Sequence, residues 1–248
     1  MGEDLHAGAF CLSSPFWAIF LWRLRSNMNK LDTRKTVMIG MLSAFAFIMA
    51  CLGNLIPIKV AGILGYDPKD IIIAISGFIL GPICAIVIAV ISSFLELITV
   101  STTGIIGFVM NVISTCFFVV PASIIYQKKR TFLRAIIGLL IGVLSMSGAM
   151  MLWNYLITPM YMAAKGVTRE IVTGMLLPVF LPFNLVKGAL NASLTMLLYK
   201  PVVSAMRQAR LLDEVPNKKN ETKVLLVICC LMVVAVSVLG LLILGDVI

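Results

Sequence analysis

The sequence has few charged residues for its length. Charged residues make up 12% of the 248 residues and hydrophobic residues 60%, and the mean hydropathy is +1.07. Soluble domains carry about 25% charged residues. The composition therefore excludes an ordinary soluble domain and indicates a multi-pass membrane protein. The net charge of +9 would suggest nucleic acid as a partner of a soluble protein. In a membrane protein its distribution over the loops matters more, and no nucleic-acid partner is expected.

Residues that carry out chemistry are also scarce. The chain has one histidine, His6, and six cysteines that lie within apolar runs. The cysteines show no CxxC or Cys/His spacing, so neither a zinc site nor a disulfide framework is expected. No nucleophile beside a base, no pair of acids and no phosphate-binding loop is visible. We therefore expect no catalytic residue, metal or cofactor, and energy for any uptake would come from an ion gradient or another subunit.

Long apolar stretches are what the chain has in abundance. The predicted stretches are Thr36–Ile56, Ile71–Leu95, Gly104–Tyr126, Ala135–Thr158, Leu177–Tyr199 and Val224–Gly245. The second is interrupted by Gly81 and Pro82, and a turn there places most of the Lys and Arg residues on one side of the membrane. The positive-inside bias therefore predicts two segments, seven membrane segments in total and a cytoplasmic N-terminus. Because 70–98 is too short for two spans of about 20 residues, at least one segment should be short, tilted or extended into the preceding loop.

The stretch Leu177–Tyr199 carries a polar face. In a helix, Asn184, Lys187 and Asn191 lie at i, i+3 and i+7 and share that face. A lysine at this depth costs at least ~2.5 kcal/mol, so Lys187 is expected to face a polar ligand site. The alternative is that Lys187 snorkels, or pairs with a carboxylate only to hold helices together.

Two further amides fall at a similar depth. At 1.5 Å per residue, Asn111 lies ~10 Å and Asn154 ~6 to 8 Å from the outer ends of their helices, and Asn184 and Lys187 lie ~9 to 14 Å deep. Amides pair donors and acceptors in one plane, which suits the edge of a heterocycle. These residues predict an outward-facing pocket for a small polar or aromatic molecule, covered by the loop 57–70. Glu96 is a candidate counter-charge for Lys187.

Small residues form a strip on the first apolar stretch. Ser43, Ala46 and Ala50 share a face, with Gly40 and Ala44 next to them. Such a strip lets another helix approach closely. The approaching helix could belong to a partner or to the protein's own bundle.

Four runs of sequence carry a resemblance to a known family. YDPKDIIIAISGFILGP (66–82), TGIIGFVMNVIS (103–114), LWNYLITPMYM (152–162) and LPFNLVKGALN (181–191) resemble the substrate-binding S component of energy-coupling factor (ECF) vitamin transporters. The most similar subfamily is the riboflavin-specific one. The resemblance covers roughly residues 30–205.

The resemblance implies a bacterial cell-membrane protein with six helices that captures a vitamin from outside. It also implies a membrane-embedded T component and two cytoplasmic ATPases as partners. For the ligand, the family pattern carries over to Asn154, Asn184, Lys187, Gly104, Leu64 and Asp67. For the T component, the AxxxA-type surface is matched by Ala46 and Ala50, with Ser43 one turn earlier.

The expected fold is an all-α integral membrane protein, a six-helix bundle with an additional C-terminal transmembrane helix. The expected layout is an N-terminal extension (1–29), the S-component domain (30–205), a basic cytoplasmic linker (206–223) and the extra segment (224–248). Translation from Met28 is an alternative to translation from Met1, and the extra segment could be an anchor or a docking helix. The rival functions are capture of another vitamin or heterocycle and ion-coupled carriage of a small molecule.

Overall fold

The computed structural model describes residues 33–55, 59–60, 64–101, 104–162, 168–209, 211 and 240. The N-terminal extension, most of the linker, and the predicted seventh membrane segment apart from Gly240 lie outside the described residues. Those parts of the sequence-based layout, and the boundaries of the S-component domain, stay predictions.

The described chain is almost entirely helical. Its helices are α2 (Thr33–Leu55), α3 (Lys69–Leu80), α4 (Pro82–Thr99), α5 (Gly104–Lys128), α6 (Phe132–Leu156), α7 (Thr158–Met162), α8 (Arg169–Met175), the π-helical η2 (Leu176–Phe180) and α9 (Leu181–Gln208). The loop before α3 contains a two-residue hairpin, in which β1 (Lys59–Val60) pairs antiparallel with β2 (Leu64–Gly65). Five helical stretches are long and apolar enough to cross a membrane, at 33–54, 82–99, 104–128, 132–160 and 169–208. The prediction of an all-α membrane protein is therefore confirmed.

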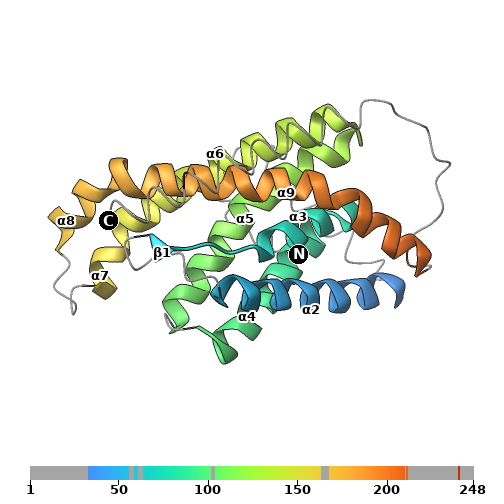
Figure 1. Cartoon of the computed structure of the whole chain (residues 1–248), viewed down its shortest axis with the longest axis horizontal. Coiled ribbons are helices and arrows are strands. Elements are labelled where there is room, and N and C mark those ends of the chain that lie inside the picture. Colours follow the sequence, from blue (N-terminus) through green and yellow to red (C-terminus); the bar gives the residue numbers. More distant parts are fainter. Residues whose placement is uncertain are drawn as a thin grey trace, which may run out of the picture.

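Helix α3 occupies the middle of the bundle. It packs against α2, α4, α5 and α9, and its first ten residues, Lys69–Phe78, are buried. Figure 1 shows α6 and α9 running alongside each other, with α2 and α4 on the opposite side of α3. With α3, the longer helices α2, α4, α5, α6 and α9 make six bundle helices in the described part of the chain. Residues at the start of α3 can thus meet side chains from most of the bundle.

The break between α3 and α4 falls where the sequence predicted it. Gly81 has φ +105° and ψ 168°, a backbone conformation that only glycine adopts without strain, and Pro82 begins α4. The prediction of two segments is confirmed, and so is the expectation that one is short, because α3 has 12 residues and α4 has 18. This end of the bundle is called the Gly81 end, and the opposite end of α3 the Lys69 end.

Aromatic side chains hold the Gly81 end together. The Phe78 ring lies 4.5 Å from the Tyr126 ring and 6.1 Å from the Tyr199 ring, measured between centroids. The two tyrosine hydroxyls are 3.0 Å apart. Ring contacts and one hydrogen bond thus join α3, α5 and α9. Each of the two tyrosine hydroxyls has the other as its hydrogen-bond partner.

The small residues of α2 face the inside of the bundle. Ser43, Ala46 and Ala50 are each 2% exposed or less, and Ala46 belongs to the main core cluster. Helix α2 packs against α3 and α4 with this face. The prediction that these three residues present a docking surface is therefore wrong for this conformation, because the chain's own helices already cover them. The alternative of packing within the bundle is the one that the structure favours.

Candidate ligand-binding site

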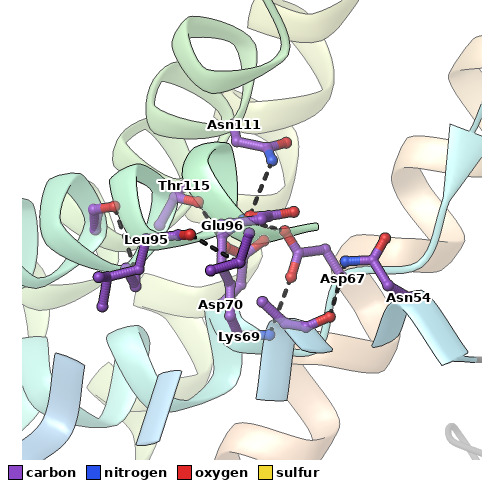
Figure 2. Close-up of polar contacts among 12 residues, drawn as sticks. Asn54, Asp67, Lys69, Asp70, Leu95, Glu96, Asn111 and Thr115 are labelled. Carbon is purple, nitrogen blue, oxygen red and sulfur yellow. Dashed lines mark hydrogen bonds and ion pairs between the residues drawn. The ribbon is translucent and has the colours of Figure 1, made fainter. Parts of the chain in front are cut away.

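A buried lysine organises the Lys69 end. The Lys69 side chain is 0% exposed, and its Nζ lies 2.5 Å from Asp67 Oδ2 and 2.5 Å from Glu96 Oε2. Asp67 precedes α3 and Glu96 comes from α4, so the pair of ion pairs joins the loop to the bundle (Figure 2). Asn111 of α5 donates from Nδ2 to the same Glu96 oxygen at 3.3 Å. A buried charge must be paired and hydrogen-bonded to be tolerated, and Lys69 meets this condition on two sides.

The neighbouring carboxylate of Asp70 is held by neutral groups. Thr115 of α5 donates to Asp70 Oδ1 at 2.6 Å, and Asn191 of α9 donates to Asp70 Oδ2 at 3.4 Å. Asn191 also contacts the loop, because its Nδ2 lies 3.3 Å from the Asp67 carbonyl oxygen and its Oδ1 accepts from the Tyr66 hydroxyl at 2.9 Å. Among the described residues, Asp70 has no cation within 4.0 Å. The Asp70 carboxyl group is thus satisfied by hydrogen bonds rather than by a direct ion pair.

The electrostatics of the loop follow from this arrangement. Burial alone would raise the pKa of Asp67, but the ammonium groups of Lys69 and Lys187 outweigh it and hold that pKa below its usual range. Burial, and then the Asp70 and Asp67 charges, raise the pKa of the Tyr66 phenol. At neutral pH, Asp67 is therefore a carboxylate and Tyr66 remains a hydrogen-bond donor.

A second group of polar residues lies on the packed faces of α6 and α9. Asn154 is 3% exposed, Asn184 3% and Lys187 8%. Helices α6 and α9 are in close contact at Gly188, the residue after Lys187, where an added side chain would collide with Val143 and crowd Met146. Gly188 therefore serves helix packing.

These three residues keep unused hydrogen-bonding capacity. Asn154 Oδ1 accepts from Thr158 at 3.0 Å, but its buried Nδ2 has no partner among the described residues. Asn184 Nδ2 donates to the Phe180 carbonyl at 2.7 Å. Within the described part of the chain Lys187 forms no ion pair. Its charge still interacts at longer range with the carboxyl groups of Asp67 and Asp70. Because most buried polar groups are hydrogen-bonded, Asn154 Nδ2 and the Lys187 ammonium are available to a further partner.

The remaining predicted site residues take different positions. Gly104 is the first residue of α5 and has φ +62°. Leu64 lies in β2, and its side chain is outside the described part. Asn111 is part of the Lys69 network through Glu96. The expectation that Glu96 supplies the counter-charge for Lys187 is wrong, because Glu96 pairs with Lys69.

Sequence reasoning missed the central role of Lys69 and the bonds of Asp70 and Thr115. Lys69 and Asp70 stand in a Gly/Pro-punctuated loop sequence, where charges are normally solvated, and nothing local shows that α3 carries them into the bundle. Asn191 was on the predicted polar face, but its hydrogen bond to the loop is made with Tyr66, which lies 125 residues earlier in the sequence. A charge pair directly before a long apolar run is the one signal that could have marked this position.

Comparison with known proteins identifies the family of this chain. Residues 34–199 match the family described as "ECF transporter, substrate-specific component". Two curated relatives are the riboflavin transporter RibU of Staphylococcus aureus (strain TCH60) and that of Streptococcus thermophilus (strain ATCC BAA-250 / LMG 18311). The first is 26% identical over 74% of this chain and 98% of its own length. The second is 27% identical over 77% of this chain and 92% of its own length.

A solved structure shows the same fold. It is titled "Structure and mechanism of the S component of a bacterial ECF transporter" and superposes with a TM-score of 0.58 at 26% identity, covering 71% of this chain and 98% of that one. The family match extends over more than half of the chain and includes every bundle helix up to Tyr199 of α9. This chain therefore belongs to the family of substrate-specific components of ECF transporters.

Proposed function

We propose that this chain is the riboflavin-binding S component of an ECF transporter, which captures the vitamin outside the cell. The observation that carries the ligand site is the unused polar capacity of Asn154 and Lys187 on the packed faces of α6 and α9. Two curated relatives that bear the name riboflavin transporter support the choice of vitamin.

In this proposal the ring edge and the ribityl hydroxyls of riboflavin replace the missing partners. Asn154 Nδ2 donates to a ring acceptor, Asn184 offers its amide oxygen, and the Lys187 ammonium forms a charge-assisted hydrogen bond. Gly104, Leu64, Asp67 and Asn111 belong to the surrounding shell. Asp67 and Asn111 act indirectly, because the Lys69 network already engages both.

The Lys69 end faces outward in this proposal, and the N-terminus is cytoplasmic. Lys128, Arg130 and Arg134 then lie on the cytoplasmic side near the Gly81 end, as the positive-inside bias requires. Release inward is driven by a T component and two ATPases, since the chain has no nucleotide-binding motif of its own. The docking surface on α2 is its exposed face, which carries Gly40, Ala44, Phe45 and Ile48. A Cβ added at Gly40 would meet no atom within 4 Å, and this open space suits close approach of a partner helix.

The absorbance spectrum of detergent-purified protein tests the ligand. A tight binder expressed in bacteria is expected to retain flavin and to show its visible absorbance at close to one flavin per chain. Apo protein should then quench the fluorescence of added riboflavin with a stoichiometry of one. A colourless preparation that leaves riboflavin fluorescence unchanged would overturn the choice of ligand and leave the family assignment standing.

A further inference from the structure

Helix α9 has no exposed apolar face, although it packs against few helices. Among the described residues, no side chain from Leu181 to Tyr199 of α9 is exposed. Helix α9 packs mainly against α3, α6 and η2. Helix α2 likewise packs mainly against two helices, α3 and α4, yet it has five large apolar side chains that are 37–55% exposed, namely Val37, Met41, Phe45, Ile48 and Leu52. The outer side of α9 is thus covered by more than the helices named here.

Gly240 lies against this outer side. It is the one described residue of the predicted membrane segment Val224–Gly245, and it is helical. A Cβ added at Gly240 would lie 3.6 Å and 3.8 Å from the two γ-methyl carbons of Val186. These distances are ordinary van der Waals separations, so the backbones of Gly240 and α9 are close to each other. One point of the last apolar stretch is therefore in place beside α9.

The direction of the rest of the segment follows from the topology. Helix α9 ends at the Gly81 end, so a segment that crosses the membrane after the linker runs antiparallel to α9. Sixteen residues separate Val224 from Gly240, and sixteen separate Val186 from Val202. Each interval is ~24 Å long in a helix, at 1.5 Å per residue. An antiparallel helix that touches Val186 at Gly240 therefore begins opposite Val202 and covers α9 along its membrane stretch.

Small residues on both partners allow a close approach. Ser237 precedes Gly240 by three residues and shares its face in a helix, and Ala189 follows Val186 by three residues in the same way. In an antiparallel pair, Ser237 then meets Ala189 one turn away from the contact of Gly240 with Val186. Van der Waals packing of this kind is what associates helices in a membrane, where lipid offers no hydrophobic drive.

We propose that residues 224–245 form a seventh bundle helix, packed antiparallel on the outer side of α9. The segment then supports the helix whose inner face carries Asn184 and Lys187, instead of acting as a separate anchor. It also closes the outer side of α9 to partner proteins. Helix α2 keeps its exposed apolar face, so a membrane partner meets α2 rather than α9.

Cysteine cross-linking of the full-length protein in membranes tests this contact. The six native cysteines are first replaced by alanine, and a protease site is inserted in the linker after α9. Val186→Cys is combined with Gly240→Cys, and Ala189→Cys with Ser237→Cys, and each pair is oxidised with copper phenanthroline. After cleavage, at least half of the protein in each pair is expected to stay joined at the mass of one chain until a reductant is added. If the cysteine-free protein does not fold, the same pairs are made with only Cys229 and Cys230 replaced.

Phe94→Cys combined with Gly240→Cys is the matched control. Phe94 is a 51% exposed residue near the Lys69 end of α4, on the other side of α3 from α9. This pair should give less than a tenth of the product of the first pair. Fragments that separate in both test pairs, or a control that links equally well, would overturn the proposal. A product with the mass of two chains would overturn it too, because the segment would then bind a second copy. None of these results depends on riboflavin, so they are distinguishable from a failure of the proposed function.

Discussion

Two buried lysines of this protein have opposite surroundings. Lys69 lies at the start of α3 with a carboxylate on either side, whereas Lys187 lies on α9 and forms no ion pair within the described part of the chain. Both are nearly or fully buried, so desolvation costs each of them several kcal/mol before any partner is counted. The comparison teaches that a buried lysine stabilises the fold where the bundle supplies its partners, and that in the proposed function it binds a ligand where the bundle supplies none.

Removing the charge of Lys69 should have the largest effect on stability. Lys69→Met leaves Asp67 and Glu96 close together without a cation, and breaking a buried pair typically costs 3–5 kcal/mol. Because both carboxylates keep some exposure, we expect a loss of about 3 kcal/mol in the free energy of unfolding. Thermal unfolding in detergent measures this, with Lys200→Met as the control, because Lys200 is an exposed lysine of α9. Equal melting temperatures for the two variants would contradict a structural role for Lys69.

Removing the charge of Lys187 should affect binding instead. Lys187→Met loses a charge-assisted hydrogen bond to the ligand, and riboflavin affinity should fall about thirtyfold, or about 2 kcal/mol. The melting temperature of the apo protein should change far less than that of Lys69→Met, because no described carboxylate loses its direct partner. Fluorescence titration and thermal unfolding of the same preparations give both values. Normal riboflavin binding by this variant would show that the pocket is elsewhere.

Changes at the Gly81 end should reduce stability without affecting binding. Gly81→Ala forces φ +105° on a residue with a side chain, and its Cβ would lie 3.2 Å from Gln127 Nε2. We expect a loss of about 2 kcal/mol, because backbone strain of this kind costs 1–3 kcal/mol. Riboflavin affinity, measured below the melting temperature, should be that of wild type. A large loss of affinity would mean that the two ends of the bundle are coupled.

The smallest effect should come from a single hydroxyl. Tyr126→Phe keeps the ring against Phe78 but removes the hydroxyl 3.0 Å from that of Tyr199. The net loss should be about 1 kcal/mol in the free energy of unfolding, as for one ordinary hydrogen bond. Thermal unfolding measures it, and Tyr199→Phe should give a similar value. A loss as large as that of Lys69→Met would contradict the view that this end is held mainly by apolar contact.

The residues of the proposed site could be predicted from the sequence, but their hydrogen-bond and ion-pair partners could not. Lys187, Asn184 and Asn154 were identified because polar residues within long apolar stretches are costly and rare. The sequence could not assign Glu96 to Lys69 rather than to Lys187, because the choice depends on which helix lies beside α4. It also could not tell that Ser43, Ala46 and Ala50 face inward, since a small-residue strip suits either kind of neighbour.

The sequence by itself determined that this is a helical membrane protein, that one helix ends and the next begins at Gly81, and that a lysine would be buried in the helix around residue 187. Hydrophobic length, glycine conformation and the cost of a buried charge are local properties, so one stretch of sequence is enough to establish them. Only the tertiary structure decided which charges pair and which stay unpaired. Ion pairs form between residues as far apart as Lys69 and Glu96, and hydrogen bonds between Tyr66 and Asn191, so the packing of the helices selects each partner.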